Sequence, residues 1–425
     1  MNPSQVVGVM PTPSVLSAKT ESGFKKTPVP QGKVEIVAYT EYASDTRVRR
    51  EAEALVSQGF QVEVICARSE SSARSSFPGS LRVIEVPLQI RKGGKARYLY
   101  QYTTFFLMAA ALLVRSAARR RINVVHVHSL PDFQVFCALP LKIRRVPVIL
   151  DLHEAMPEIL RARFHVSQHS LWFRVAVLLE RISCRFADRV IAANDGIRAA
   201  VVDRGGPANP ITVVYNAGDL PLVGASNEDL RRQYGLPRNP LIVHAGAIDA
   251  ERDLTTLVRA IALLPEDSQV YLVMVGPAVP EYLTSVRQEA IALGISERVL
   301  YLGKVPAEEA VALMSLSSVG VVTLEANPLT ELAWPGRVVE FAHLEKPLIV
   351  PRLRFLQAQL ADCALFYTPG DPRSLAQQLL RLMETPNSAT QAIANAKALC
   401  RRFDYNHMKT TLGELYSALT PVPAS

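Results

Sequence analysis

Short runs of β-branched residues alternate along this chain with longer segments of helical periodicity, and this alternation restricts the fold more than any other feature. Helices are expected between the runs, for example over Thr46–Ser57 and Leu171–Phe186. Strands in the first half are expected at residues 34–39, 61–66, 82–86, 124–128, 148–151, 189–193 and 212–215. Strands covered on both faces read as continuous apolar runs, so we expect a parallel sheet with helices on both sides.

A second series of runs begins after a loop at residues 216–238. Its strands are expected at residues 241–245, 270–275, 299–302, 319–322, 347–350 and 364–367. A chain of 425 residues is also longer than one domain usually is. We therefore predict an α/β fold with two Rossmann-like domains facing a cleft. The expected parts are a flexible tail (1–32), an N-terminal domain (33–217), a C-terminal domain (218–400) and a final helix with a tail (401–425).

The charge is distributed unevenly between the two halves. The net charge is +8, made up of +12 over residues 1–215 and −4 over the remainder. A basic half suits an anionic membrane surface, a phosphorylated ligand or nucleic acid, and a merely solvated basic surface is the alternative. The basic residues are scattered and show no motif that reads nucleic acid, so we expect no nucleic-acid partner.

The cysteines and the N-terminus predict a cytoplasmic location. The five cysteines form no C-x-x-C pair, and the N-terminus lacks the basic segment and apolar run of a signal peptide. An uncharged run at residues 98–114 is interpreted as a buried helix, with peripheral association at the inner face of the plasma membrane as the alternative.

Glycine follows several expected strands of the second half, at residues 246–253, 276–280, 303–306 and 335–341. At such turns a bare backbone can approach a phosphate, and the next helix offers free N–H groups. Arg252 and Arg337 add paired, permanently charged donors that suit a diphosphate. Glu340, in the first turn of its helix, can accept the hydroxyls of a ribose.

Seven stretches, in this order and spacing, resemble the family 4 glycosyltransferases of GT-B fold, of the bacterial cell-surface polysaccharide type. They are SDTRVRREAEALVSQGFQVEVI (44–65), VVHVHSLPD (124–132), VILDLHEAMPE (148–158), ADRVIAANDGI (187–197), ITVVYNAGD (211–219), VHAGAIDAERDLTTLVRAI (243–261) and WPGRVVEFAHLEKPLIV (334–350). The resemblance covers roughly residues 34–418. It implies a final helix that crosses back to the N-terminal domain, and sugar transfer with retention from a nucleoside-diphosphate donor to a glycan or lipid-linked acceptor.

Matched residue by residue, the resemblance also implies a set of site residues. His128 would face the reacting sugar as the catalytic residue. The donor would be held by Gly246, Arg252, Gly276, Lys304, Val305, Arg337 and Glu340. The acceptor is assigned to Asp45, Arg49, His153 and Glu154. No cofactor is expected, because the nucleotide sugar is a substrate.

Three positions depart from the pattern of the family. Residues 39–45 replace its glycine pair after the first strand, Leu332 replaces the first glutamate of its Glu-x7-Glu motif, and Ala247 replaces an arginine. Arg252 and Arg337 must therefore carry more of the diphosphate charge.

A metal-independent reaction is expected, because the chain contains no Asp-x-Asp pair that could clamp a metal. His126 and His128 alternate on one strand and should share a face, with His126 a packed core histidine. A metal site built from His126, His128, His153 and Glu154 is the alternative.

The acceptor is expected to be anionic and lipid-linked, gathered by Arg47, Arg49 and Arg50 together with the arginines at residues 119–121. A water-soluble acceptor is the alternative. Two other functions stay open: a sugar-nucleotide epimerase of the same fold, and a catalytically degenerate binding partner.

Overall fold

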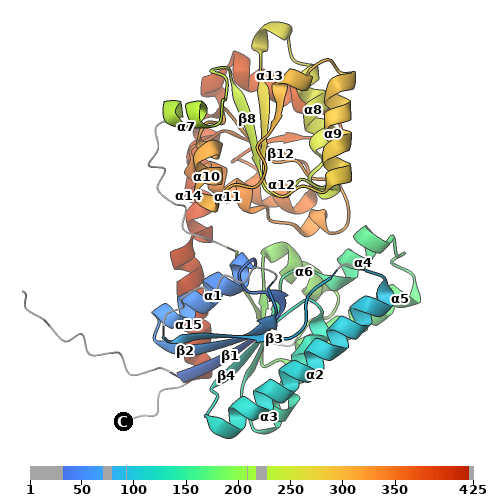
Figure 1. The fold of residues 1–425 in the computed structure, drawn as a ribbon, viewed down its shortest axis with the longest axis vertical. Helices are drawn as coiled ribbons and strands as arrows, with labels where there is room; N and C mark the ends of the chain where they lie inside the picture. Colours follow the sequence, from blue (N-terminus) through green and yellow to red (C-terminus); the bar gives the residue numbers. More distant parts are fainter. Residues whose placement is uncertain (1–31, 70–78, 92, 208, 217–226, 421–425) are drawn as a thin grey trace, which may run out of the picture.

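The computed structural model describes residues 32–69, 79–91, 93–207, 209–216 and 227–420 (Figure 1). The expected tail, except Gly32, and part of the loop at 216–238 lie outside the described residues. The N-terminal domain holds a seven-stranded parallel sheet of order β3-β2-β1-β4-β5-β6-β7. Its strands are β1 Gly32–Glu41, β2 Phe60–Ala67, β3 Leu81–Val86, β4 Val124–His128, β5 Val148–Leu152, β6 Arg189–Ala192 and β7 Ile211–Val213.

Helices cover both faces of this sheet, as the uninterrupted apolar strands predict. They are α1 Thr46–Ser57, α2 Lys95–Arg119, η1 Asp132–Ala138, α3 Leu139–Ile143, α4 Met156–Phe164, α5 Leu171–Phe186 and α6 Asp195–Asp203. One core packs Leu55 of α1 and Leu412 of the last helix against the sheet, and the other packs Phe105 and Leu113 of α2.

The C-terminal domain repeats the parallel pattern in two three-stranded sheets, β10-β9-β8 and β11-β12-β13, joined by a bridge between Leu241 and Ser317. Its strands are β8 Leu241–Ala245, β9 Tyr271–Val275, β10 Val299–Tyr301, β11 Gly320–Val321, β12 Leu348–Pro351 and β13 Leu365–Tyr367. Its helices are α7 Asn227–Gln233, η2 Ala250–Arg252, α8 Leu254–Ala262, η3 Glu266–Ser268, α9 Pro280–Ala292, η4 Ser296–Arg298, α10 Ala307–Ser315, η5 Thr330–Leu332, α11 Gly336–His343, α12 Arg354–Leu360, α13 Pro372–Glu384, η6 Pro386–Ala389 and α14 Thr390–Cys400. The predicted architecture of two Rossmann-like domains is confirmed.

The end of the chain returns to the N-terminal domain through η7 Arg401–Phe403 and α15 Tyr405–Leu419 (Figure 1). Leu412 and Tyr416 of α15 are buried in the same core as α1. The expected crossing of the final helix is thus confirmed. Where the chain passes between the domains, Trp334 packs against Tyr215 and Phe403, with ring centroids 5.7 and 4.7 Å away.

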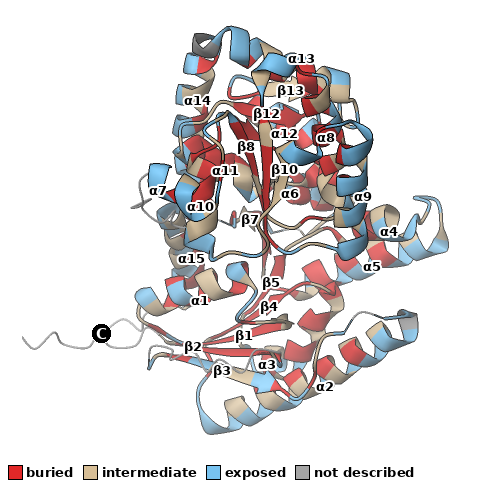
Figure 2. Cartoon of the chain, turned by 45° about the horizontal axis from the view of Figure 1, so that its top comes forward, coloured by how far each residue is buried: buried red, intermediate tan, exposed pale blue. Residues whose placement is uncertain are grey.

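The domains also touch where α6 begins. A methyl group added to Gly196 would stand 2.8 Å from the carbonyl oxygen of Leu332, so only glycine permits this approach. A second contact between the domains is the ion pair of Arg163 in α4 with Glu251 in η2, at 3.1 Å. Figure 2 shows the buried cores of both domains and the exposed helices around them.

The uncharged run at residues 98–114 lies within α2. Phe105, Ala109 and Leu113 are fully buried against the sheet, whereas Leu107 is 61% exposed. This agrees with the interpretation as a domain helix. Among the helices that the structure describes, none has the length and apolar character needed to span a membrane.

Candidate active site

A cleft of about 1250 Å³ separates the two domains at the carboxyl ends of their strands, where open parallel sheets bind ligands. Residues from both domains line it. Of the residues predicted from the sequence, those that line this cleft are Asp45, Arg47, Arg49, Arg50, His128, His153, Glu154, Gly246, Arg252, Arg337 and Glu340. The fold therefore brings most of the predicted site together.

The C-terminal wall of the cleft gathers two arginines around the turn after β8. A methyl group on Gly246 would lie 3.6 Å from the Arg337 Nε atom, so the guanidinium rests against this turn. The Nε2–H group of His244 donates a hydrogen bond of 3.1 Å to the carbonyl oxygen of Ala247. Burial, together with the positive charges of Arg337 and Arg252, lowers the pKa of His244 to about 4. Two arginines therefore offer positive charge beside this turn, while the lowered pKa favours a neutral His244.

The first turn of α11 carries the remaining predicted donor residues. Arg337 and Glu340 form an ion pair one turn apart, and both are partly exposed to the cleft. The N-terminus of α11 also presents free backbone N–H groups to this space, which favours an anion. Arg252, 37% exposed, approaches Asp249 only at 4.0 Å and so keeps donors free for a ligand.

Three predicted donor residues do not line the cleft. Gly276 packs directly on the neighbouring turn, where a methyl group would stand 2.0 Å from the carbonyl oxygen of Gly246, and its φ is +134°. Lys304 is exposed beyond the end of β10, and Val305 is partly buried against the domain core. Gly276 thus shapes the turn that carries Gly246.

The N-terminal wall begins at the start of α1. The Asp45 side chain caps this helix by accepting hydrogen bonds from the backbone N–H groups of Arg47 and Val48, each at 3.1 Å. Arg49 borders the cleft and lies 3.8 Å from Glu53. Arg47 also lines the cleft, but it is only 4% exposed. The prediction that Arg47 contributes to a surface for an anionic acceptor is therefore wrong, because its guanidinium is turned inward.

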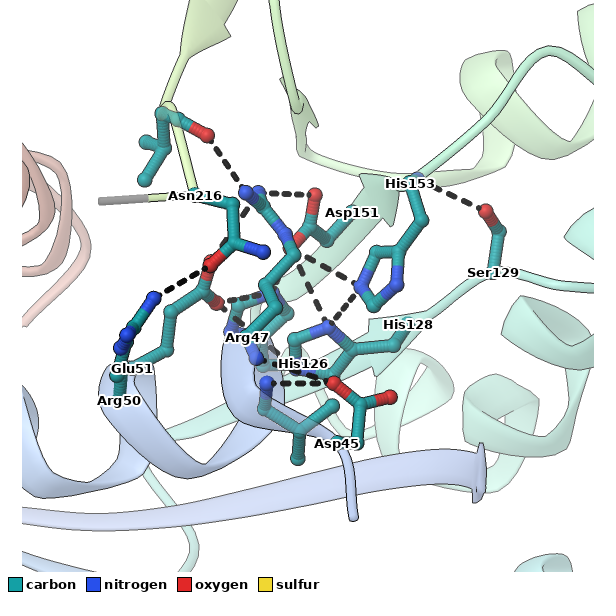
Figure 3. Close-up of polar contacts among 12 residues, drawn as sticks. Asp45, Arg47, Arg50, Glu51, His126, His128, Ser129, Asp151, His153 and Asn216 are labelled. Atoms are coloured by element: carbon teal, nitrogen blue, oxygen red, sulfur yellow. Dashed lines mark hydrogen bonds and ion pairs between the residues drawn. The ribbon is translucent and has the colours of Figure 1, made fainter. Parts of the chain in front are cut away.

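Arg47 instead anchors a buried polar cluster beneath the cleft (Figure 3). Its Nε and Nη2 atoms donate to both carboxylate oxygens of Asp151 at 2.9 and 2.8 Å, and Nη1 donates to the carbonyl oxygen of Val214 at 2.7 Å. Glu51, one helical turn further on, lies 3.1 Å from Arg47. A bidentate pair of this kind ties α1 to the end of β5.

The protonation of this cluster follows from its burial. Burial would raise the pKa of Asp151, but Arg47 and the hydrogen bonds from His128 and His153 outweigh it and hold that pKa well below its usual range. Burial, reinforced by the charge of Asp151, raises the pKa of Glu51 well above its usual value. Burial also lowers the pKa of both His126 and His128. These shifts favour a charged Arg47–Asp151 pair beside the neutral forms of Glu51, His126 and His128.

His126 and His128 share one face of β4, as predicted, and their rings stack with centroids 4.3 Å apart. His126 is fully buried and shares a hydrogen bond of 2.8 Å with the Tyr416 hydroxyl of α15. His128 is 1% exposed, and its Nδ1 atom lies 2.7 Å from His153 Nε2 and 3.2 Å from Asp151. Its Nε2 atom has no hydrogen-bond partner among the described residues.

His153 is the more accessible of the two cleft histidines, with 20% of its side chain exposed. It follows β5 directly, and its backbone N–H donates to the Ser129 hydroxyl at 3.2 Å (Figure 3). The pair of imidazoles thus extends from the buried carboxylate of Asp151 to the cleft. This arrangement orients His128, whose other ring nitrogen is buried 3.9 Å from the Glu51 Oε2 atom.

The alternative metal site takes a different form from the one predicted. Among the described residues, the possible ligand atoms that come together, within 4.8 Å of one another, belong to Glu51, His126, His128 and Asp151. Glu154 is not among them. The positive charge of Arg47 already lies against both carboxylates. Arg47 therefore already supplies the positive charge that pairs with Asp151.

The structure separates the arginines that were predicted to form one basic surface. Arg49 and Arg50 follow β1 at the cleft, since both line it. Residues 119–121 precede β4 and so lie at the opposite edge of the parallel sheet. The prediction that both groups of arginines serve one acceptor surface is therefore wrong.

Four residues of the site were not singled out from the sequence: Glu51, Asp151, His244 and Tyr416. Asp151 and His244 did carry a signal, because each stands at the end of a strand within a quoted stretch. Tyr416 carried none, since its place beside His126 depends on the return of α15.

Family models match nearly the whole described chain in two parts. Residues 43–217 match the "Glycosyl transferase 4-like domain", and residues 226–399 match "Glycosyl transferases group 1". These matches favour transfer over the epimerase and the degenerate-partner alternatives.

Two curated relatives are distantly similar. Sulfoquinovosyl transferase of Arabidopsis thaliana is 21% identical over 332 residues, covering 75% of this chain and 61% of the relative. D-inositol 3-phosphate glycosyltransferase of Corynebacterium efficiens is 25% identical over 222 residues, covering 49% and 51%. The matches thus span between half and two thirds of the relatives' lengths.

Solved structures share the arrangement of domains. Sucrose-phosphate synthase from Thermosynechococcus elongatus superposes with a TM-score of 0.73 at 17% identity, covering 91% of this chain and 99% of that one. HepE of Anabaena, solved with UDP and glucose, gives 0.67 at 20% identity, covering 91% and 100%. At these identities the likeness establishes the fold.

Proposed function

Because this chain belongs to the family 4 glycosyltransferases of GT-B fold, we propose that it transfers a sugar from a nucleoside-diphosphate donor to a glycan or lipid-linked acceptor. The C-terminal domain holds the donor, the N-terminal domain holds the acceptor, and the new bond keeps the anomeric configuration of the donor. The observation that carries this proposal is the placement of Arg252, Arg337 and the N-terminus of α11 across one cleft from His128 and His153.

The donor diphosphate needs the charge that the C-terminal wall provides. Arg252 and Arg337 offer planar donors, and the backbone at Gly246 permits close approach. As the leaving group departs, these fixed donors stabilise its growing negative charge without reorganisation. Glu340 holds the ribose hydroxyls. The base is assigned to the segment with Lys304 and Val305, which leads into Ala307 and Glu308 at the cleft, while Gly276 supports the turn that carries Gly246. HepE, whose structure contains UDP, makes UDP the first nucleotide to test.

The reacting sugar lies against the N-terminal wall. His128 orients a donor hydroxyl or steadies positive charge on the sugar, and Asp151 holds its imidazole in place from below. Asp45, Arg49, His153 and Glu154 surround the acceptor on the same side. This proposal also includes a role in bacterial cell-surface polysaccharide synthesis and a cytoplasmic location. It further includes an acceptor held at the inner face of the plasma membrane. Flotation with anionic vesicles tests the last of them.

The donor site is tested by removing its arginines. Arg252→Ala and Arg337→Ala should each weaken nucleoside-diphosphate binding at least about tenfold, because a charge-assisted contact contributes roughly 1.5–3 kcal/mol. A thermal-shift panel with UDP, GDP and ADP identifies the nucleotide, and titration then gives the affinities. Arg381→Ala, at an exposed position of α13, is the matched control. Unchanged affinity in both site variants would place the diphosphate elsewhere.

Metal removal tests the proposed electrostatics. Transfer should persist in EDTA, because the arginines and helix termini meet the charge of the diphosphate. Initial rates are measured before and after chelation, and again after adding Mg²⁺ or Mn²⁺. Complete loss on chelation, reversed by a single divalent ion, would contradict metal independence.

A further inference from the structure

Helix α5, Leu171–Phe186, points its large apolar side chains away from the domain core and toward the surface. Its buried positions hold Ala176, Glu180, Ser183 and Cys184. Its outer face carries a stripe of large apolar side chains, 38–73% exposed: Leu171, Trp172, Val175, Leu178, Leu179 and Ile182. A helix on the surface of a soluble domain normally turns such a stripe toward the core. We call these six residues the α5 stripe.

The inward face of α5 is fixed by a buried ion pair. Glu180 accepts two hydrogen bonds from Arg204, at 2.9 and 2.6 Å, and Glu158 of α4 accepts a third at 2.6 Å. Both carboxylates are almost completely buried. Turning the helix to hide the α5 stripe would expose this network, so the outward orientation of the stripe belongs to the fold.

The charge around the α5 stripe has a single sign. Between residues 155 and 187 the chain has five arginines and two acidic residues, Glu158 and Glu180. Both acidic residues form ion pairs with Arg204. Arg174 and Arg185 share the exposed face of α5 with the stripe. Neither forms an ion pair with any other described residue. The face is therefore apolar in its centre and basic along its length.

An apolar centre with arginines beside it fits an anionic lipid surface better than a second copy of the chain. A second copy of the chain would bring Arg174 and Arg185 against identical arginines, and like charges in a desolvated contact are unfavourable. Anionic headgroups would instead accept those arginines while the apolar side chains enter the region of the upper acyl chains. Tryptophan, such as Trp172, prefers this boundary because its ring is apolar and its N–H is polar.

We propose that the α5 stripe docks the enzyme on an anionic phospholipid bilayer, with α5 lying flat in the headgroup region. A helix of 16 residues is about 24 Å long and, with its arginines, suits an in-plane position. Figures 1 and 2 place α4 and α5 together at the outer side of the N-terminal domain.

Docking here would serve the proposed acceptor, and to that extent the inference rests on the proposed function. The cleft residues His153 and Glu154 directly precede α4, which leads into α5. A lipid-linked acceptor held in this bilayer would therefore meet the acceptor side of the cleft over a short path. The arginines at 119–121, at the opposite edge of the sheet, are not needed for it.

Vesicle flotation with the full chain tests this surface without donor or acceptor. We expect binding to vesicles of phosphatidylglycerol and phosphatidylcholine, and little binding to phosphatidylcholine alone. Trp172→Glu and Leu178→Glu should each reduce binding at least about tenfold. Arg174→Glu with Arg185→Glu should reduce it by about fivefold or more per arginine and remove the preference for anionic lipid. Ile291→Glu, at a 66% exposed position of α9, is the matched control and should bind as the wild type does.

Tryptophan fluorescence reports the insertion directly. The chain has two tryptophans, and the emission of Trp172 should shift to the blue and be quenched by brominated lipid. Trp172→Phe should keep vesicle binding and lose this signal. Each variant is checked for unchanged stabilisation by UDP, which shows a folded enzyme and separates this test from that of the donor site.

Two outcomes would overturn the proposal. One is equal recovery of the wild type in the soluble fraction with both lipids. The other is a dimer in solution that the α5 variants convert to a monomer while vesicle binding stays unchanged, because a second copy would then cover the stripe.

Discussion

His128→Ala is expected to slow sugar transfer by about a hundredfold or more, because it removes a preorganised group at the reacting sugar. Donor affinity should stay within about twofold of the wild type, since the nucleotide is held by the other domain. In the structure, Asp151 and His153 fix one ring nitrogen of His128, and the other is buried 3.9 Å from Glu51, so the ring is held in one orientation beside the cleft. Single-turnover rates and nucleotide titrations separate the two effects.

The control for this experiment lies two residues away on the same strand. His126→Ala removes an equally buried imidazole, but its contact is the Tyr416 hydroxyl of α15 and not the cleft. This variant should lose thermal stability and keep its turnover below its melting temperature. A fast His128→Ala enzyme beside an inactive His126→Ala enzyme would reverse the proposed roles.

Arg47→Met is expected to destabilise the fold by about 3–5 kcal/mol, the usual cost of stranding one member of a buried ion pair. The variant leaves Asp151 without its bidentate partner and the carbonyl oxygen of Val214 without its donor. Chemical denaturation at pH 7, followed by circular dichroism, measures the free energy of unfolding.

The pH dependence of this loss has a defined sign. The folded pKa of Asp151 lies well below its unfolded value of about 3.9, so its contribution is complete above that value. It disappears as the pH falls through the lower folded pKa. The difference between the wild type and Arg47→Met should therefore shrink under acidic conditions.

Glu51→Gln is the matched control for Arg47→Met. Burial raises the pKa of Glu51 and so favours its protonated form, and a neutral amide of the same size should therefore change the stability at pH 7 by less than about 1 kcal/mol. Equal losses in Glu51→Gln and Arg47→Met would mean that Glu51, and not Asp151, carries the negative charge of the pair.

The sequence alone determined the architecture, because its signals are local. A strand buried on both faces must be apolar throughout, and β4 and β5 are buried at every position, as their sequences indicate. The glycine turn after β8 marks the cleft, and Gly276 after β9 packs against that turn so closely that a side chain is excluded there. Parallel strands bring their carboxyl ends to one edge, so candidate residues could be read from those positions.

Only the tertiary structure decided what those residues touch. Arg47 and Asp151 are 104 positions apart, and His126 and Tyr416 are 290 apart. No periodicity relates such pairs, so Arg47 looked like a surface charge when it is the counter-ion of a buried carboxylate. The same holds for α5: its pattern predicts a helix with an apolar face, but the pairing of Glu180 with Arg204 decides that this face points outward. Local sequence preferences determine which residues form helices and strands. Burial and charge pairing between distant residues determine how those elements are oriented and which side chains are protonated.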